Sequence, residues 1–203
     1  MKIIGVGRNY VNHAKELGND VPKEPIIFLM PETALITRNL PFFYPDFSNE
    51  IHHEVELVLK INRLGKNIPE KFANRYYDEI GVGIDFTARD LQRKAAAAGL
   101  PWTISKGFDG AAPVGNFVSK AELGDLNNIC FSLERNGEVV QQGNSADMIF
   151  PFDAIIAYAS KFFTLKIGDL IFTGTPVGVG PVQIGDNLVA KIGDRELLNF
   201  NVK

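Results

Sequence analysis

Three acidic side chains occupy positions from which they could share a cation. Glu54 and Glu56 lie two residues apart in the segment NEIHHEVELVLKI, residues 49–61, which is typical of a strand. Residues i and i+2 of a strand share a face, so both carboxylates would point the same way. Two ionised carboxylates at one point repel each other unless a cation lies between them or one binds a proton. A hard divalent ion such as Mg²⁺ or Mn²⁺ is one solution, and a solvated outer face of an antiparallel strand is the plainer alternative.

A third carboxylate follows another apolar run. Asp85 comes directly after the segment GVGI, residues 81–84, and Thr87 and Asp90 then match the capping pattern of a helix that begins there. A charge at the end of an apolar strand is typical of a site residue, but a turn aspartate near the positive end of a helix is an equal alternative. Asp85 therefore extends the candidate cation site without establishing it.

The three histidines divide into one candidate general base and two structural side chains. His13 and Glu16 are three residues apart in a predicted helix over residues 8–18, so the carboxylate would lie beside the imidazole. Such a carboxylate fixes the tautomer of the ring and raises its basicity, whereas the alternative is an exposed helix pair. His52 and His53 would point to opposite faces of their strand, so they cannot act as a matched pair. For both we expect either a structural role or an indirect role in supporting the residues of a site.

Two glycine-rich segments could bring further groups to the site. GLPWTISKGFDGAAPVG, residues 99–115, is predicted to be a long loop, and its Lys106 is either a solvated lysine or an anion-binding group. FTGTPVGVGP, residues 172–181, could present backbone amides and the hydroxyls of Thr173 and Thr175 to an anion. The second segment has neither a P-loop nor a G-x-G-x-x-G pattern, so nucleotide binding is disfavoured.

The composition limits the class of protein. The chain has 203 residues, of which 45% are hydrophobic and 22% charged, and its net charge of −3 gives no basic footprint for nucleic acid. No apolar stretch approaches the roughly 18 to 20 residues that span a membrane, and the short apolar run before Arg8 is not typical of a signal peptide. The single cysteine, Cys130, is expected to be a buried and unreactive thiol. We expect a cytoplasmic protein that binds neither nucleic acid nor membranes.

Hydrophobic runs and turn residues predict a β-rich α+β fold in one domain, residues 1–203. Asn136-Gly137 is a strong hairpin signal, and three Ile-Gly-Asp turns separate short strands near the C-terminus. The segment PIIFLM, residues 25–30, is predicted to be a buried strand. Helices are predicted after Pro69, Thr87 and Pro151.

Five segments together resemble the fumarylacetoacetate hydrolase family, and most closely its short acylpyruvase and oxaloacetate decarboxylase branch. They are GVGRNYVNHAKELG, HHEVEL, GIDFTARDLQ, GLPWTISKGFDGAAPVG and FTGTPVGVGP, which occur in the family's order and cover nearly the whole chain. The resemblance implies the mixed β-roll fold of the family's C-terminal domain, and usually a homodimer. It also implies one Mg²⁺ or Mn²⁺ held by Glu54, Glu56 and Asp85, with Lys106 as the active-site lysine.

The resemblance implies roles for five other residues. By this likeness His13 and Glu16 form the dyad that handles a proton or a water molecule. Gln92 and Thr175 match positions that contact the substrate. Arg8 is a looser candidate for binding the distal group of the substrate.

The implied chemistry is cleavage of a carbon–carbon bond in a short 2-oxo or 2,4-dioxo acid. Hydrolysis of an acylpyruvate such as fumarylpyruvate, or decarboxylation of oxaloacetate, would pass through an enolate stabilised by the metal and Lys106. Without cleavage, the same site would act as a tautomerase of oxaloacetate or an isomerase of 2-hydroxy-diene-dioates, which is the nearest alternative. A non-catalytic metabolite-binding protein is a third hypothesis, which the His13–Glu16 pair disfavours.

Overall fold

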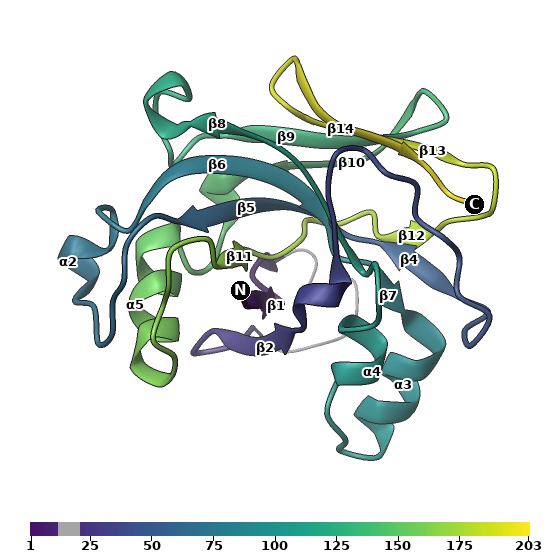
Figure 1. The fold of residues 1–203 in the computed structure, drawn as a ribbon, viewed down its shortest axis with the longest axis horizontal. Helices are drawn as coiled ribbons and strands as arrows, with labels where there is room; N and C mark the ends of the chain where they lie inside the picture. The colour runs from purple at the N-terminus through teal and green to yellow at the C-terminus, as the bar shows by residue number, and fades with distance from the viewer. Residues whose placement is uncertain (12–20) are drawn as a thin grey trace.

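The computed structural model describes residues 1–11 and 21–203, and the strands within these residues form three sheets. The largest has seven strands in the order β2-β1-β11-β5-β6-β8-β3 (Figure 1). Its strands are β1 (Ile3–Gly7), β2 (Ile26–Met30), β3 (Leu35–Ile36), β5 (Val55–Ile61), β6 (Tyr77–Ile84), β8 (Ala112–Ser119) and β11 (Leu170–Phe172). β1 pairs in parallel with β11 although the two strands come from opposite ends of the chain. The N-terminal strand is thus inserted beside the C-terminal half of the fold.

A second sheet covers the first. Its order is β10-β9-β13-β14, and its strands contact β6 and β8 of the larger sheet. Its strands are β9 (Cys130–Arg135), β10 (Glu138–Asn144), β13 (Asn187–Ile192) and β14 (Arg195–Asn201). Asn136 and Gly137 join β9 to β10 with φ angles of 55° and 84°, as a type I′ turn requires, so the predicted hairpin is confirmed.

The third sheet is small, and the chain passes from it directly into the candidate site. It contains β12 (Gly180–Pro181), β4 (Ile51–His53) and β7 (Thr87–Ala88). The chain leaves β4, passes through Glu54 and enters β5 in the large sheet. The predicted single strand over residues 49–61 is therefore two strands in two sheets, and Glu54 lies at the point where the chain changes partners.

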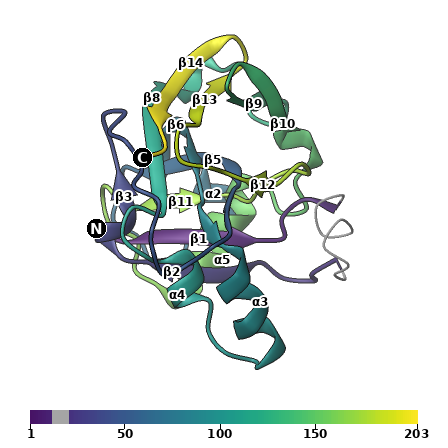
Figure 2. The same cartoon turned by 90° about the vertical axis from the view of Figure 1, so that its right-hand side faces the viewer.

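The helices pack in two pairs. They are α2 (Glu70–Ala73), α3 (Arg89–Ala97), α4 (Thr103–Lys106) and α5 (Phe152–Phe162), with short 3₁₀ turns at Glu32–Ala34, Lys120–Glu122 and Ser145–Asp147. α2 packs on α5, and α3 packs on α4 on the side away from the four-stranded sheet (Figures 1 and 2). No helix in the described part of the chain is long and apolar enough to cross a membrane. The predicted β-rich α+β fold is confirmed.

Several local predictions are corrected by long-range contacts. β2 is an edge strand, and Leu29 in it is 41% exposed, so residues 25–30 are not a buried strand. Cys130 is exposed rather than buried. Residues 99–115 are not one loop, because α4 and the start of β8 lie within them. The predicted helix over residues 8–18 falls largely outside the described residues.

The predicted cap of α3 does not form. The helix begins at Arg89 with Ala88 as its N-cap residue and no side-chain cap bond. The Thr87 hydroxyl donates to the Asp85 carbonyl, and Asp90 accepts a hydrogen bond from the Ser48 hydroxyl at 2.6 Å. The Asp90 carboxylate, which the local pattern predicts to cap α3, thus bonds Ser48 instead, a residue distant in sequence.

Candidate metal centre and active site

The three predicted carboxylates meet where β5 and β6 end side by side. Val55 of β5 pairs with Ile84 of β6, and the next amide, that of Asp85, donates to the Glu54 carbonyl at 2.9 Å. This pairing sets Asp85 beside Glu54, and Glu56 lies one step further along β5. Each side chain offers a carboxylate oxygen, and these oxygens lie within 4.8 Å of one another. All three residues are buried. The structure thus brings together the three residues expected to hold a metal.

Residues 173–175 run alongside β5 and fix Glu56. The Gly174 amide donates to Glu56 Oε2 at 2.7 Å. On either side of this contact, the hydroxyl of Thr173 donates to the Leu57 carbonyl and that of Thr175 to the Val55 carbonyl, both at 2.9 Å. The loop is therefore bonded to β5 directly before and after Glu56, and one oxygen of this carboxylate is already bonded to the backbone.

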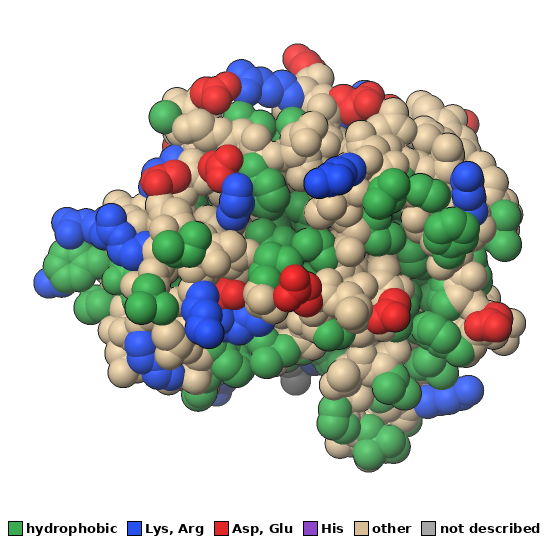
Figure 3. Space-filling model, in the orientation of Figure 1, with side chains coloured by type: hydrophobic (Ala, Val, Ile, Leu, Met, Phe, Trp, Pro, Cys, Tyr) green, Lys and Arg blue, Asp and Glu red, His purple; other side chains and the backbone are tan. Residues whose placement is uncertain are grey.

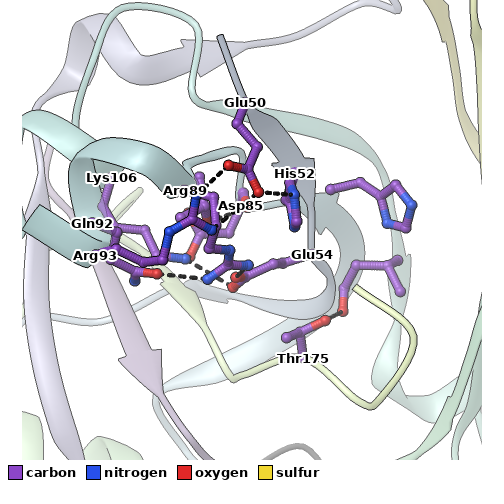
Figure 4. Close-up of polar contacts among 12 residues, drawn as sticks. Glu50, His52, Glu54, Asp85, Arg89, Gln92, Arg93, Lys106 and Thr175 are labelled. Atoms are coloured by element: carbon purple, nitrogen blue, oxygen red, sulfur yellow. Dashed lines mark hydrogen bonds and ion pairs between the residues drawn. The ribbon is translucent and has the colours of Figure 1, made fainter. Parts of the chain in front are cut away.

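Two buried cations face the carboxylates. Lys106 Nζ lies 2.8 Å from Glu54 Oε2 and 2.7 Å from Asp85 Oδ2 (Figure 4). Arg89 Nη2 lies 2.5 Å from Glu54 Oε1. Lys106 is the last residue of the short helix α4, and Arg89 is the first residue of α3, so the packed pair of helices delivers both cations. The three carboxylates still outnumber the two cations.

Burial and mutual repulsion set the protonation of the cluster. Burial, followed by the charge of Asp85, raises the pKa of Glu56 well above its usual range. Burial also raises the pKa of Asp85, while Lys106 acts in the opposite direction. Burial alone would lower the pKa of Lys106, but the adjacent charges of Asp85 and Glu54 raise it overall. In the metal-free protein the excess negative charge is therefore costly, and the lysine is a fixed cation.

The residues present fit a hard divalent cation. All the converging donors are carboxylate oxygens, which Mg²⁺ and Mn²⁺ prefer. Asp85 Oδ1 is buried and has no hydrogen-bond partner among the described residues. An unpartnered buried carboxylate oxygen is costly, and coordination of a cation would satisfy it. The plainer alternative of a solvated strand face does not apply, because both faces of β5 are buried around Glu56.

The three residues expected to bind substrate have different surroundings. Gln92 is half-buried one turn along α3, and its Oε1 accepts from Arg89 Nη1 at 2.5 Å. Thr175 is buried, and its hydroxyl donor is already bonded to Val55. The Arg8 guanidinium lies over the Trp102 ring at 5.9 Å, and Arg8 has a positive φ of 58°. Substrate contacts by these residues remain predictions, and His13 and Glu16 lie outside the described residues.

His52 and His53 have the structural partners expected of them. His52 Nε2 lies 3.0 Å from Glu50 Oε1, and the same carboxylate accepts from Arg93 at the surface (Figure 4). His53 is buried and bonds through Nδ1 to Gln141 Oε1 at 2.8 Å. The two rings therefore do not act as a pair.

Sequence reasoning missed four buried polar residues around the cluster, namely Arg89, Gln141, Asn9 and Tyr10. Arg89 opens a helix and Gln141 lies in a strand, where such residues are usually solvated. Asn9 is fully buried; its amide donates to the Phe150 and Thr173 carbonyls and thereby joins the end of β1 to the loop beside Glu56. The tripeptide Arg8-Asn9-Tyr10 directly follows a strand, and its unusual density of polar side chains was the available signal.

Tyr10 carries a buried hydroxyl whose contribution to stability can be tested directly. It is 3% exposed, and its hydroxyl has no partner among the described residues. Because an unsatisfied buried hydroxyl costs free energy, Tyr10→Phe should leave the free energy of unfolding unchanged or raise it by up to about 1–3 kcal/mol. The matched control is Tyr77→Phe, because Tyr77 is equally buried but its hydroxyl donates to Asp153 at 3.3 Å. Urea denaturation in EDTA measures both, and an equal loss of stability in the two variants would contradict the prediction.

The fold and this cluster define an enzyme-like site: a buried carboxylate triad with a buried lysine at the end of a β-roll. The chain belongs to the fumarylacetoacetate hydrolase family, because residues 2–202 match the family of the fumarylacetoacetate (FAA) hydrolase C-terminal domain. The resemblance inferred from the sequence is thus confirmed. Similar proteins carry the names of an oxaloacetate tautomerase, an oxaloacetate decarboxylase, a fumarylpyruvate hydrolase and a hydroxymuconate isomerase, so the predicted enzyme class is confirmed as well.

Three similar proteins illustrate the range of activities. The chain is 45% identical over 202 residues to an oxaloacetate tautomerase, FAHD1, of Arabidopsis thaliana, covering 100% of this chain and 91% of the relative. It is 45% identical over 185 residues to a mitochondrial oxaloacetate decarboxylase of Dictyostelium discoideum, covering 91% and 85%. The structure of fumarylpyruvate hydrolase from Pseudomonas aeruginosa, in complex with Mn²⁺ and pyruvate, is 36% identical with a TM-score of 0.93 and covers 100% and 89%.

Proposed function

We propose that this chain, as one catalytic domain over residues 1–203, uses Mg²⁺ or Mn²⁺ to cleave a carbon–carbon bond in short 2-oxo or 2,4-dioxo acids. Acylpyruvates, fumarylpyruvate and oxaloacetate are the proposed substrates. The observation that carries the proposal is that the buried carboxylates of Glu54, Glu56 and Asp85 converge on one point. Lys106 forms ion pairs with two of them, Glu54 and Asp85. The Mn²⁺ and pyruvate in the related fumarylpyruvate hydrolase support both the metal and the product.

The metal would be held by Glu54, Glu56 and Asp85, and when bound it would polarise the oxygens of a 2-oxo carboxylate as a Lewis acid. The chain supplies the remaining electrostatics. Lys106 is a buried ammonium fixed beside the triad, so it stabilises negative charge that develops on the substrate as an enolate forms. This stabilisation is strong because the ammonium of Lys106 is itself buried.

Arg89 and Gln92 give the site a directional hydrogen-bond donor. Arg89 bonds both Glu54 and Gln92 Oε1. Because the Gln92 oxygen accepts from Arg89, its amide nitrogen is left to donate, as binding a substrate carboxylate requires. We propose that His13 and Glu16 activate water for attack on the distal acyl carbon of an acylpyruvate. Decarboxylation of oxaloacetate needs no such water.

Keto–enol tautomerisation of oxaloacetate is the second candidate. It is favoured by the name of the Arabidopsis relative, which is 45% identical over the whole of this chain. Tautomerisation requires only that a proton leaves C3 and one is added to the C2 oxygen, or the reverse, so it would use the same triad and lysine without cleavage. The geometry of the described residues serves both reactions, and the reaction products separate them.

The decisive experiment compares acetylpyruvate, fumarylpyruvate and oxaloacetate with Mg²⁺, with Mn²⁺ and with EDTA. Pyruvate release above the background rate that disappears in EDTA would support cleavage. Loss of the oxaloacetate enol absorbance without pyruvate would support the tautomerase. A His13→Ala variant should lose hydrolysis and keep decarboxylation, and equal loss of both would contradict the proposed role of His13. If neither signal responds to metal, the proposed activity is wrong.

We also propose that the protein is a homodimer, as the resemblance implies, and that it is cytoplasmic, as its composition suggests. An apolar cavity of about 500 Å³ is lined by Phe47, Leu91, Thr103, Ile104, Gly107 and Phe108. Apolar side chains gather over α3 and α4 (Figure 3), where Ile104 is 66% exposed, and such a surface suits contact with a second copy of the chain. Sedimentation equilibrium tests the dimer, and a monomer at micromolar concentration would contradict it. Imaging of a tagged full-length protein in its own cell tests the location.

A further inference from the structure

Gln141 breaks the burial pattern of its strand. In a regular strand, residues 139 and 141 share a face, yet Val139 is 59% exposed whereas Gln141 is 2% exposed. The pairing of β10 with β9 shifts register between these two residues, which marks a β-bulge. A bulge redirects the following side chain and is common beside active sites. The chain thus exposes a valine and buries an amide, against the preference of both side chains for their surroundings.

The buried amide makes four hydrogen bonds. Its oxygen accepts from the Val55 amide at 3.0 Å and from His53 Nδ1 at 2.8 Å. Its nitrogen donates to Thr175 Oγ1 at 3.0 Å and to the Pro176 carbonyl at 3.1 Å. The orientation of the amide is unambiguous, because a backbone amide can only donate and a carbonyl can only accept. The ring of His53 therefore carries a proton on Nδ1.

These four bonds hold the two segments that position the glutamates. His53 and Val55 are the residues on either side of Glu54, at the point where the chain passes from β4 to β5. Thr175 and Pro176 belong to the segment whose Gly174 amide bonds Glu56 Oε2. Gln141 therefore bonds to the backbone beside Glu54 through its oxygen and to the loop beside Glu56 through its nitrogen.

We propose that Gln141 is a positioning residue of the metal centre, which keeps Glu54 and Glu56 converged on one cation while touching neither. The inference rests on the proposed function, since it takes these carboxylates as metal ligands. Residues that orient ligands through hydrogen bonds typically contribute about 10–100-fold to metal affinity. A purely structural glutamine would contribute to folding but would leave metal affinity unchanged.

The test measures Mn²⁺ binding by calorimetry, together with the thermal midpoint of the metal-free protein. Gln141→Met keeps the length of the side chain and removes all four bonds, and it should weaken Mn²⁺ binding about 10–100-fold. Gln142→Met is the matched neighbour, because Gln142 is exposed and should bind Mn²⁺ like the wild type. Ser160→Ala controls for lost stability, since the buried Ser160 hydroxyl in α5 accepts from the Ile68 amide and donates to the Ala157 carbonyl.

A second variant keeps the test decisive if Gln141→Met does not fold. Thr175→Val preserves shape and removes one acceptor of the Gln141 amide together with the bond to Val55, and it should weaken Mn²⁺ binding about tenfold. Wild-type affinity in folded Gln141→Met, or in Thr175→Val if that variant alone folds, would overturn the inference and leave the proposed function standing. A wild-type protein that binds no Mn²⁺ would overturn both.

Discussion

Replacing Lys106 with methionine should lower the free energy of unfolding of the metal-free protein by about 3–5 kcal/mol. Lys106 is 3% exposed, and its ammonium lies within 2.8 Å of both Glu54 and Asp85. Methionine keeps much of the length of the side chain but removes the charge, which leaves buried carboxylates with less compensation. Removal of one partner of a buried ion pair costs far more than the net value of the pair, because the remaining charge cannot regain its hydration.

The control for Lys106 lies on the strand that carries Glu56. Lys60 pairs with Glu79 at 2.6 Å, and both side chains are more than 40% exposed, so Lys60→Met should cost at most about 1 kcal/mol. Urea denaturation in EDTA measures both variants. Added Mn²⁺ should then raise the midpoint of Lys106→Met more than that of the wild type, because the variant cluster is more negative. Similar losses for Lys60→Met and Lys106→Met would mean that the carboxylates do not depend on the lysine.

The elements that the sequence predicts well are those fixed by local chemistry. The Asn136-Gly137 hairpin follows from two residues that accept positive φ, and α5 begins directly after Pro151 as its sequence indicates. The failures have a common cause in contacts that are distant in sequence. Asp90 bonds Ser48 instead of capping α3, and residues 25–30 lie at a sheet edge because β1 pairs with β11 on its other side. Nothing local encodes either partner.

The candidate site divides in the same way. Glu54 and Glu56 are recognisable because they share one face of a strand, and Asp85 because it directly follows an apolar run. The family motif supplies the remainder of that prediction. Arg89 and Gln141 are ordinary surface residues by composition, so only tertiary structure reveals that they are buried. The β-bulge that turns Gln141 inward has no glycine or proline at its position to announce it.

In the absence of metal, replacing Glu56 with glutamine should leave the free energy of unfolding at neutral pH unchanged or raise it, whereas Lys106→Met should lower it. Burial raises the pKa of Glu56, so its folded pKa lies above its unfolded value of about 4.3. A carboxyl group of this kind contributes stability below its unfolded pKa and loses that contribution as the pH rises through its folded pKa. The metal-free wild type should therefore lose stability over that range. Glu56→Gln carries no ionisable group at this position, so its free energy of unfolding should not fall with pH for this reason. The variant should be at least as stable as the wild type at neutral pH.

Bound Mn²⁺ should reverse the order of stability, so that the wild type becomes more stable than Glu56→Gln. Glutamine can still accept from the Gly174 amide, but it removes the charge of a proposed ligand. Mn²⁺ affinity should therefore fall by more than the roughly 10–100-fold typical of residues that only orient ligands, with loss of metal-dependent activity. Saturating Mn²⁺ then stabilises the wild type much more than the variant, because stabilisation follows the ratio of metal concentration to Kd. Urea denaturation with EDTA and with Mn²⁺ measures this crossing, with Glu79→Gln as the unaffected control, since the Glu79 side chain is 44% exposed. If Glu56→Gln destabilises the metal-free protein as Lys106→Met does, an ionised Glu56 must be fully compensated by the protein itself. A triad whose excess negative charge is compensated by a cation requires this reversal of stability between EDTA and Mn²⁺. It also requires that Lys106→Met and Glu56→Gln change the stability of the metal-free protein in opposite directions.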